Sequence, residues 1–495
     1  MKKLNELFDT ELDINITNLN DDSKLIKEGG VFFAIRGLTN DGNKFNKSAI
    51  DNGAVCIVSD EDVNESVPVI KVDDAQVAYN EALNKFYGNV RDRFKFIGVT
   101  GTDGKTTTSE MIYQLLNKYD KCGYIGTNGI KYDSFYKESE HTTPFPADLY
   151  SAFNEFRNLG CNYISLECSS ERLGTHKVDG IGFEVAIFTN LSRDHLDTHK
   201  TMENYADAKA VLFKNLKPSG LGIINYNDEY KDHFIKACNG KYVTYSIDND
   251  NADLYASNIK MTYDVLEFDI NGLYNKHIKT YVSGLFNVNN IMCAILALTH
   301  LGFDIDSVVE NILDLKPIES RQILIKTEFG FNVMVDYGHT KNAIKNLYDY
   351  VRPLVKGKLV AVYGAAGSRD PQRMIDVANF LTENVDYSYL TIEDARYDEP
   401  DYLLKKMISE VKTHNFDLIE DRDYAIKKAI MNANEGDLVL ILGKGLEAYQ
   451  VTKGELIPRP NDLESAKDAL KERELMTQKN WFKSVFYLTL IHEIW

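Results

Sequence analysis

The sequence predicts an α/β protein with three domains: a small N-terminal α/β unit, a central domain with a mostly parallel sheet, and a C-terminal Rossmann-like domain. Three observations lead to this prediction. A length of 495 residues suits about three domains. Short β-rich segments alternate with amphipathic helical segments along most of the chain. A glycine-rich turn joins one β-rich segment, residues 94–100, to a helical segment.

The N-terminal domain is expected to comprise residues 1–90. Its short apolar segments are separated by polar turns, which is typical of a small α/β unit. The expected strands are 31–35, 54–58 and 67–72, and the expected helix is 75–87.

The central domain is expected to span residues 91–318 and the third domain residues 319–475. In both, strands alternate with helices, which favours parallel sheets and, in the third domain, a Rossmann-like arrangement. The expected strands are 163–167, 185–189 and 222–225 in the central domain, and 332–336, 358–363, 387–391 and 438–442 in the third.

The last segment, 476–495, is an unassigned hydrophobic tail that contains both tryptophans of the chain, Trp481 and Trp495. We expect it to pack against its own domain. A docking segment or an interfacial anchor is the alternative, although the tail lacks the basic face that membrane anchoring favours.

Composition limits the classes of partner. A net charge of −18 argues against nucleic acid, because a phosphate backbone requires a basic surface. The six cysteines have no paired CxxC spacing, and the N-terminus is soon polar, so reduced thiols and a cytoplasmic protein without a signal peptide are expected. No run reaches the ~18 apolar residues of a membrane helix, so no membrane span is expected.

The glycine-rich turn predicts a nucleoside triphosphate site. Glycines let the backbone wrap around a phosphate, and a helix N-terminus adds positive charge. Lys105 supplies a full positive charge and Thr106 can ligate Mg²⁺. Val99 stands where the common phosphate loop has its first glycine. The loop residues are Gly101, Thr102, Asp103, Gly104, Lys105, Thr106 and Thr107.

Two further segments of the central domain carry candidate ligands. Glu167 ends an expected strand, where it can complete the Mg²⁺ shell that Thr106 begins; a lone glutamate there is more commonly a surface residue. His195 follows another strand beside Asn190 and Arg193, and its neutral imidazole can bind a second Mg²⁺. Most histidines bind nothing, but this polar cluster favours a site.

Lys209 lies on the apolar face of an expected helix. Burial lowers the pKa of a lysine and makes its amine reactive, unless the ammonium reaches water past its stem. The helical pattern alone favours a side chain whose ammonium reaches water.

These motifs resemble the Mur ligase family, whose members use ATP to join amino acids to carboxylates. The segments Gly101-Thr-Asp-Gly-Lys-Thr-Thr107, His141-Thr-Thr-Pro144, Glu167-Cys-Ser-Ser170 and Tyr205-Ala-Asp-Ala-Lys209 have the order and spacing of its MurE-type members, the UDP-N-acetylmuramoyl-tripeptide synthetases of peptidoglycan synthesis. The central domain is then an ATPase domain with a phosphate loop, and the N-terminal domain a uridine-diphosphate module.

The resemblance implies that Lys209 is carbamylated and positions the second Mg²⁺. It also implies that Thr142, Thr143 and Ser169 contact the muramoyl-dipeptide. Family members often carry His-Gly or His-Ala after Ser170 and an arginine six positions later. Here the chain has Glu171-Arg172 and Lys177, which could hold a carboxylate only as a point charge.

Flanking segments extend the resemblance. Ser23 belongs to a segment like the family's uridine-diphosphate module, with Lys24 and Asn43 as departures. Asn287 and Asn290 resemble the segment that closes on adenine. Asp336, with the departures Gly338 and Lys341 nearby, could contact nucleotide from the third domain, and Arg321 is expected at the hinge.

The resemblance also places amino-acid selection in the third domain, through Arg373, Asp394, Arg396, Gly443 and Glu447. Arg396 suits the distal carboxylate of meso-diaminopimelate. Asp394, where those enzymes have asparagine, instead favours a bare ammonium such as that of L-lysine. The choice between the two amino acids stays open.

The expected activity is therefore that of an ATP-dependent carboxylate–amine ligase. It adds a diamino acid to UDP-MurNAc-L-Ala-D-Glu through an acyl phosphate, with ATP and Mg²⁺. Another ligase of the superfamily, such as one like folylpolyglutamate synthetase, is an alternative. A catalytically silent nucleotide-binding regulator is a second, given the departures at 171, 177, 338 and 446. Lys105, Glu167, His195 and Lys209, all present, argue against it.

Overall fold

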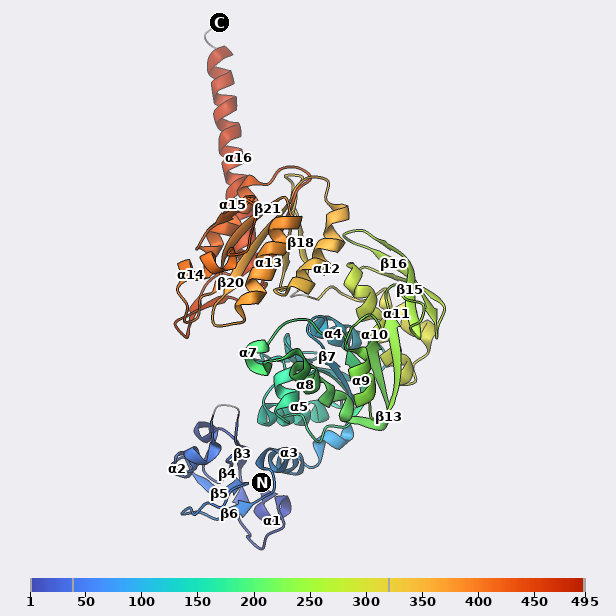
Figure 1. Cartoon of the computed structure of the whole chain (residues 1–495), viewed down its shortest axis with the longest axis vertical. Coiled ribbons are helices and arrows are strands. Elements are labelled where there is room, and N and C mark those ends of the chain that lie inside the picture. Colours follow the sequence, from blue (N-terminus) through green and yellow to red (C-terminus); the bar gives the residue numbers. More distant parts are fainter. Residues whose placement is uncertain (1, 38–39, 319–320, 493–495) are drawn as a thin grey trace.

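The computed structural model describes residues 2–37, 40–318 and 321–492, with side chains through residue 478. Three α/β domains follow one another along the long axis of the molecule (Figure 1). The expected α/β class is confirmed in each. The expected start of the third domain, residue 319, and Trp495 lie outside the described residues.

The N-terminal domain is built on a parallel sheet in the order β3-β4-β5-β6. Asp74 caps the helix that follows, accepting a hydrogen bond from the Val77 backbone N–H (2.9 Å). The elements are β1 (Lys2–Lys3), α1 (Leu4–Leu7), β2 (Asn15–Ile16), β3 (Asn18–Asn20), β4 (Gly30–Phe33), α2 (Asn46–Asp51), β5 (Ala54–Ser59), β6 (Val69–Lys71) and α3 (Ala75–Phe86).

The central domain holds a sheet in the order β10-β9-β8-β11-β7-β12-β13-β14-β15-β16-β17. Neighbours from β8 to β15 in this order pair in parallel. The strands are β7 (Lys95–Thr100), β8 (Cys122–Gly126), β9 (Gly129–Tyr132), β10 (Phe135–Lys137), β11 (Tyr163–Glu167), β12 (Phe183–Phe188), β13 (Leu216–Asn225), β14 (Lys241–Ser246), β15 (Leu254–Met261), β16 (Leu266–Gly272) and β17 (Lys276–Thr280).

The helices of this domain lie between the parallel strands and after the last strand. They are α4 (Lys105–Leu116), α5 (Pro146–Leu159), α6 (Ser170–Gly174), α7 (Leu196–His199), α8 (Met202–Lys214), α9 (Lys231–Ala237), α10 (Leu285–His300) and α11 (Ile305–Ile312).

The expected alternation of strands and helices fails in two stretches of the central domain. Strands β8, β9 and β10 follow one another as antiparallel neighbours with no helix between them. From β14 to β17 four strands follow one another with no helix between them. The last two pairings, β15 with β16 and β16 with β17, are antiparallel. Antiparallel neighbours need only a short turn, so the connections from β15 to β17 require no helix. The parallel pair β14 and β15 is joined without a helix as well, and it is in register only at Tyr245–Leu254 and Ser246–Tyr255.

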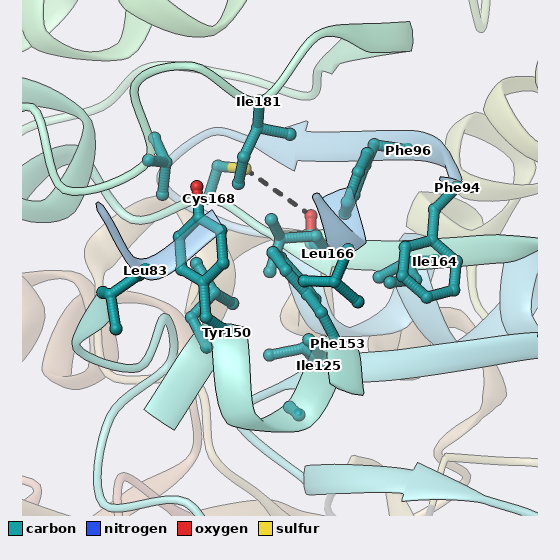
Figure 2. Packing of buried hydrophobic residues seen from close by; sticks show 14 of the residues in the cluster. Leu83, Phe94, Phe96, Ile125, Tyr150, Phe153, Ile164, Leu166, Cys168 and Ile181 are labelled. Carbon is teal, nitrogen blue, oxygen red and sulfur yellow. Dashed lines mark hydrogen bonds between the residues drawn. The ribbon is translucent and has the colours of Figure 1, made fainter. Parts of the chain in front are cut away.

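Strand β11 separates two environments and thereby orients Glu167. Ile164, Leu166 and Cys168 belong to one buried cluster, where the Cys168 thiol faces the Leu166 carbonyl across 3.7 Å (Figure 2). Successive side chains of a strand point to opposite faces, so Ser165 and Glu167 face the other side. There the Ser165 hydroxyl donates to the Ser109 carbonyl of α4 (2.8 Å).

The third domain has a sheet in the order β18-β19-β23-β20-β21-β22, parallel except for the edge strand β18. Its elements are β18 (Ile323–Lys326), β19 (Asn332–Asp336), α12 (Lys341–Val351), β20 (Leu359–Ala366), α13 (Pro371–Asn384), β21 (Tyr387–Asp394), α14 (Pro400–Met407), β22 (Phe416–Leu418), α15 (Arg422–Asn432), β23 (Leu438–Leu442), β24 (Tyr449–Thr452), β25 (Glu455–Pro458) and α16 (Asp462–His492).

Helix α16 continues through the expected division at residue 476. Its first part packs on α15, with Ala466 and Ala469 buried. Leu475 and Met476 are about half exposed, and the helix then projects away from the domain (Figure 1). The expectation that this segment packs against its own domain is therefore wrong for the described backbone. None of the described helices is long and apolar enough to cross a membrane.

Candidate active site

The carboxyl ends of two parallel sheets open onto one cleft with a volume of about 770 Å³. In the central domain, β7, β11 and β12 end in register, with Glu167 opposite Val99 and Phe188 opposite Thr100. In the third domain, Asp336 pairs with Leu442 and Ala366 with Asp394 at the strand ends. Ligands of open α/β sheets bind at this edge, so the cleft is the candidate site.

The glycine-rich loop forms one wall of the cleft. A side chain at Gly101 would place its Cβ 1.9 Å from the Thr189 hydroxyl, so only glycine fits there. Gly104 has a left-handed backbone (φ 83°) immediately before α4. The Lys105 ammonium donates to the carbonyls of Gly101 (3.0 Å) and Thr102 (2.8 Å), which holds it over the loop.

Thr106 and Glu167, far apart in sequence, meet beneath this loop. The Thr106 hydroxyl donates to Glu167 Oε2 (2.9 Å), and the Thr127 backbone N–H donates to Oε1 (2.9 Å). Glu167 has no exposed surface. Two hard oxygen donors beside a phosphate loop fit Mg²⁺, which proteins hold through one or two carboxylates together with phosphate oxygens and water.

His195 and Lys209 both lie near the Tyr205 ring. The ring centroids of His195 and Tyr205 lie 6.1 Å apart, and Lys209 Nζ lies 4.5 Å from the Tyr205 centroid. Desolvation, and then the nearby charges of Lys209 and Lys105, lower the pKa of His195 to about 4, although Asp194 opposes the shift. The imidazole is thus neutral at pH 7 and able to bind a metal.

Lys209 is buried, with 1% of its surface exposed, so the expectation of a snorkelling side chain is wrong. Its ammonium donates to the Gly101 carbonyl (2.7 Å) and forms no ion pair with a described residue. Burial, and then the charge of Lys105, lower the pKa of Lys209 well below its ordinary value.

Within the described residues, no three His, Cys, Asp or Glu side chains converge as a ready-made metal site. Of the four expected metal-binding residues, Thr106 and Glu167 are hydrogen-bonded to each other, and His195 and Lys209 both lie near Tyr205.

Residues of the third domain reach the loop across the cleft. The Thr340 hydroxyl donates to the Asp103 carboxylate (3.1 Å), and Arg321 Nη2 lies 3.5 Å from the Thr106 hydroxyl. Asp336 is buried and accepts from the backbone N–H groups of Gly338 (2.7 Å) and Gln322 (3.0 Å). Burial raises the pKa of Asp336 although the positive charge of Arg321 opposes this.

Asp194 is a functional candidate that the sequence did not single out. Its carboxylate lies 3.4 Å from Arg373 Nη1, 3.4 Å from His195 Nε2 and 3.8 Å from His339 Nε2, so it joins the two walls of the cleft. Burial would raise the pKa of Asp194, but His339, His195 and Arg373 hold it well below its ordinary value. The sequence could have indicated Asp194, because it stands directly before the candidate residue His195.

The expected adenine segment starts helix α10. Asn290 Nδ2 donates to Asn287 Oδ1 (3.0 Å), and the Thr108 hydroxyl of α4 donates to Asn290 Oδ1 (3.0 Å). Asn290 lines the cleft, whereas Asn287 is buried behind it.

The expected residues for the UDP-linked substrate divide into two groups. Thr142, Thr143 and Ser169 line the cleft. Ser23 lies in the N-terminal domain, where its hydroxyl contacts that of Ser48 (3.1 Å). Lys177 does not line the cleft, because its ammonium faces Asp21 of the N-terminal domain (3.4 Å).

Of the expected amino-acid residues, Arg373, Asp394, Arg396 and Glu447 line the cleft. Gly443 lies beside them, since a Cβ there would meet the Glu393 carboxylate at 2.9 Å.

The negative charge of Asp394 is already paired. Asp394 Oδ1 accepts from the Lys444 ammonium (2.9 Å) and from the Val451 backbone N–H (2.9 Å). The same ammonium donates to Glu447 Oε2 (2.9 Å), and Lys444 is completely buried. Asp394 therefore has a cation of the protein as its partner in addition to any substrate ammonium. Sequence reasoning missed Lys444 as the partner, although it stands next to Gly443.

Comparisons with known proteins identify all three domains. Residues 15–91 match the model for the Mur ligase family catalytic domain, residues 99–298 the Mur ligase middle domain, and residues 321–445 the Mur ligase glutamate ligase domain.

Two curated relatives are similar over most of the chain. A UDP-N-acetylmuramoyl-L-alanyl-D-glutamate–2,6-diaminopimelate ligase of Clostridium acetobutylicum is 36% identical, over 90% of this chain and 93% of the relative. The corresponding ligase of Clostridium tetani is 35% identical, over 92% and 96%.

Solved structures agree in fold. A UDP-N-acetylmuramoyl-L-alanyl-D-glutamate–2,6-diaminopimelate ligase superposes with a TM-score of 0.67 at 27% identity, covering 96% of this chain and 99% of that one. MurF ligase from Thermotoga maritima, in complex with ADP, superposes with a TM-score of 0.65 at 19% identity, covering 92% and 98%.

Proposed function

Because the chain belongs to the Mur ligase family of ATP-dependent ligases, we propose that it joins meso-diaminopimelate to UDP-MurNAc-L-Ala-D-Glu. One observation carries the proposal. Thr106, which is hydrogen-bonded to the buried Glu167, and the loop lysine Lys105 line the same cleft as the charged cluster around Asp394 and Arg396. A phosphate site and an amino-acid site in one cleft are what an acid–amino-acid ligase requires.

The charges in the third domain favour diaminopimelate over L-lysine. The Arg396 guanidinium lines the cleft, and among the described residues it has no ion-pair partner. It is therefore free to hold a distal carboxylate through two parallel hydrogen bonds. Asp394 is paired with Lys444, so it offers little charge to a bare ammonium. Glu393, which also lines the cleft without an ion pair to a described residue, supplies a carboxylate for the distal amine.

The reaction uses ATP because a carboxylate is a poor electrophile at neutral pH. The D-glutamyl side-chain carboxylate takes the γ-phosphoryl group to form an acyl phosphate, and ADP is released. The amine of diaminopimelate attacks the acyl carbon, and phosphate leaves. The protein contributes position, electrostatic stabilisation and exclusion of water by the facing domains.

Within this reaction, Lys105 would leave its loop carbonyls to contact the transferring phosphoryl group. Thr106 and Glu167 would hold one Mg²⁺, and His195 a second. Bound Mg²⁺ neutralises the negative charge that develops on the phosphoryl oxygens. ATP consumption and a nucleotide-linked substrate also support a cytoplasmic site for the reaction.

Carbamylation of Lys209 is part of the proposal. Carbamate formation with CO₂ requires a neutral amine, and burial together with Lys105 lowers the pKa of Lys209. The carbamate would turn a buried amine beside His195 into an oxygen ligand for the second Mg²⁺.

The test is phosphate release by the purified protein with Mg·ATP and UDP-MurNAc-L-Ala-D-Glu. L-lysine, meso-diaminopimelate and L-ornithine are offered separately. We expect turnover with meso-diaminopimelate and at least tenfold less with L-lysine, because one charge-assisted contact to Arg396 is missing. Preference for L-lysine would contradict the specificity. If the protein binds ATP but releases no phosphate with any of the three amino acids, the result would favour a nucleotide-binding regulator instead.

A further inference from the structure

Arg172, on the short helix α6, is a buried cation that has no role in the reaction proposed above. It is 4% exposed, yet it lines the cleft. Arg172 Nε donates to the Thr143 carbonyl (3.2 Å), and Nη1 donates to Glu171 (2.6 Å). The guanidinium lies 4.0 Å from the centroid of the Phe145 ring. Among the described residues, Nη2 has no hydrogen-bond partner.

These contacts connect Arg172 to the phosphate end of the cleft. The Thr143 hydroxyl donates to the Glu167 carbonyl (2.6 Å) and accepts from the Ser169 backbone N–H (2.9 Å). Arg172 is thus anchored to the same backbone that carries the candidate Mg²⁺ ligand Glu167. A guanidinium stacked on a ring and bonded to a carbonyl has little freedom left to lose on binding.

Lys177 lies over the same ring but differs in its ion pair and in its place relative to the cleft. Its ammonium pairs with Asp21 (3.4 Å) and lies 5.1 Å from the centroid of the Phe145 ring, farther than the Arg172 guanidinium. It does not line the cleft. Of Arg172 and Lys177, only Arg172 therefore lines the cleft.

We propose that Arg172 binds the free α-carboxylate of the D-glutamyl residue while its side-chain carboxylate is activated. This inference rests on the proposed function. The guanidinium would donate to the α-carboxylate from Nη2, and also from Nη1 after the hydrogen bond of Nη1 to Glu171 breaks. The Glu171 side chain is 58% exposed, so its ion pair with Arg172 is weak and easily exchanged. Binding both ends of the D-glutamyl group presents one chosen carboxylate to the phosphoryl donor.

A pair of substrates isolates this contact. UDP-MurNAc-L-Ala-D-Glu is compared with UDP-MurNAc-L-Ala-4-aminobutyrate, which keeps the reacting carboxylate and lacks the α-carboxylate. For the unaltered protein we expect kcat/KM to fall about 10- to 100-fold with the second substrate. In Arg172→Met this discrimination should shrink to within about threefold, and Arg172→Lys should be intermediate. Lys177→Met is the matched control and should discriminate like the unaltered protein.

Affinity for ATP, measured by calorimetry, checks that each variant folds and should not change. Unchanged discrimination between the two substrates in Arg172→Met, or loss of that discrimination in Lys177→Met, would overturn the role assigned to Arg172. Either result would leave the proposed function intact. Failure of the unaltered protein to bind UDP-MurNAc-L-Ala-D-Glu would overturn the proposed function and this inference with it.

Discussion

Two buried lysines, one in the central domain and one in the third domain, show how the hydrogen-bond partners of an amine determine its protonation. Lys209 in the central domain and Lys444 in the third domain are both almost completely buried. Lys209 donates to a backbone carbonyl, and its pKa is lowered well below its ordinary value. Lys444 donates to two carboxylates, and although burial opposes it, Glu447 and Asp394 raise the pKa of Lys444.

The difference matches the work expected of each wall. A carbonyl offers only a partial charge, so a buried ammonium beside it is costly and the neutral amine is favoured. Carboxylates repay the desolvation of an ammonium, so the third domain keeps a charged, ordered cluster. The central domain therefore supplies the reactive groups of the cleft, and the third domain supplies an ordered set of charges for binding the substrate.

The largest expected effect is at the phosphate loop, where Lys105→Ala removes the cation nearest the transferring phosphate. We expect kcat for phosphate release to fall by about 10³-fold or more, since comparable cationic groups contribute that much in phosphoryl transfer. Folding should be preserved, because Lys105 bonds only to carbonyls of its own loop. A kcat within tenfold of the unaltered protein would contradict this role.

Breaking the third-domain cluster should act on stability. Lys444→Met leaves two carboxylates without their shared cation and should lower the free energy of unfolding by about 3–5 kcal/mol. Lys209→Met is the matched comparison and should cost only about 1 kcal/mol, because it removes one hydrogen bond to a carbonyl. Urea unfolding of both variants measures the two values, and equal losses would show that the partners do not distinguish these lysines.

The chemical role of Lys209 is tested by Lys209→Ala. We expect kcat to fall about 10²-fold, with partial recovery when a short carboxylate such as formate is added, because it can occupy the place of the carbamate. Lys105→Ala should show no such recovery. Normal activity in the Lys209→Ala protein would exclude the carbamate.

The two lysines should also give opposite pH dependences. The folded pKa of Lys209 lies below 10.5, so between the two values the unfolded chain binds one more proton. Stability then rises with pH, by at most about 1.4 kcal/mol per pH unit. The pKa of Lys444 is raised, so its contribution is fully present below 10.5 and is lost as the pH rises through the folded value.

The measurement is urea unfolding of the unaltered protein, Lys209→Met and Lys444→Met from about pH 7 to pH 10, in buffer without CO₂. The advantage of the unaltered protein over Lys209→Met should grow with pH. Its advantage over Lys444→Met should stay constant. A constant difference in the Lys209 series would show that its amine is charged in the folded protein.

The smallest expected effect is that of Asp394→Asn. The amide oxygen can still accept from Lys444 and Val451, so we expect a stability loss of about 1 kcal/mol and an unchanged preference for meso-diaminopimelate. Competition between L-lysine and meso-diaminopimelate measures the preference. A tenfold shift toward either amino acid would show that Asp394 itself selects the substrate.

Local sequence patterns predicted the central wall well. A strand, a glycine turn and a helix follow one another directly, so Lys105 and Thr106 could be placed from neighbouring residues alone. Glu167 could be placed because strand ends share one edge of a parallel sheet. The burial of Lys209 was visible as an apolar helix face, but not whether its amine reaches water.

In the third domain, local sequence patterns could not predict which charged residues pair with one another. Asp394 and Lys444 are fifty positions apart in sequence and belong to different strand ends, so their ion pair exists only after the sheet has formed. The same holds for Lys177 and Asp21, which come from different domains, so that Arg172 lines the cleft and Lys177 does not.

The sequence by itself determined the α/β class, the phosphate loop and the residues that meet at the strand ends, because these depend on short-range periodicity and turn chemistry. Only the tertiary structure decided which charges remain free. The energy of a buried charge depends on the partners that folding brings within hydrogen-bonding distance, and those partners are not neighbours in the chain.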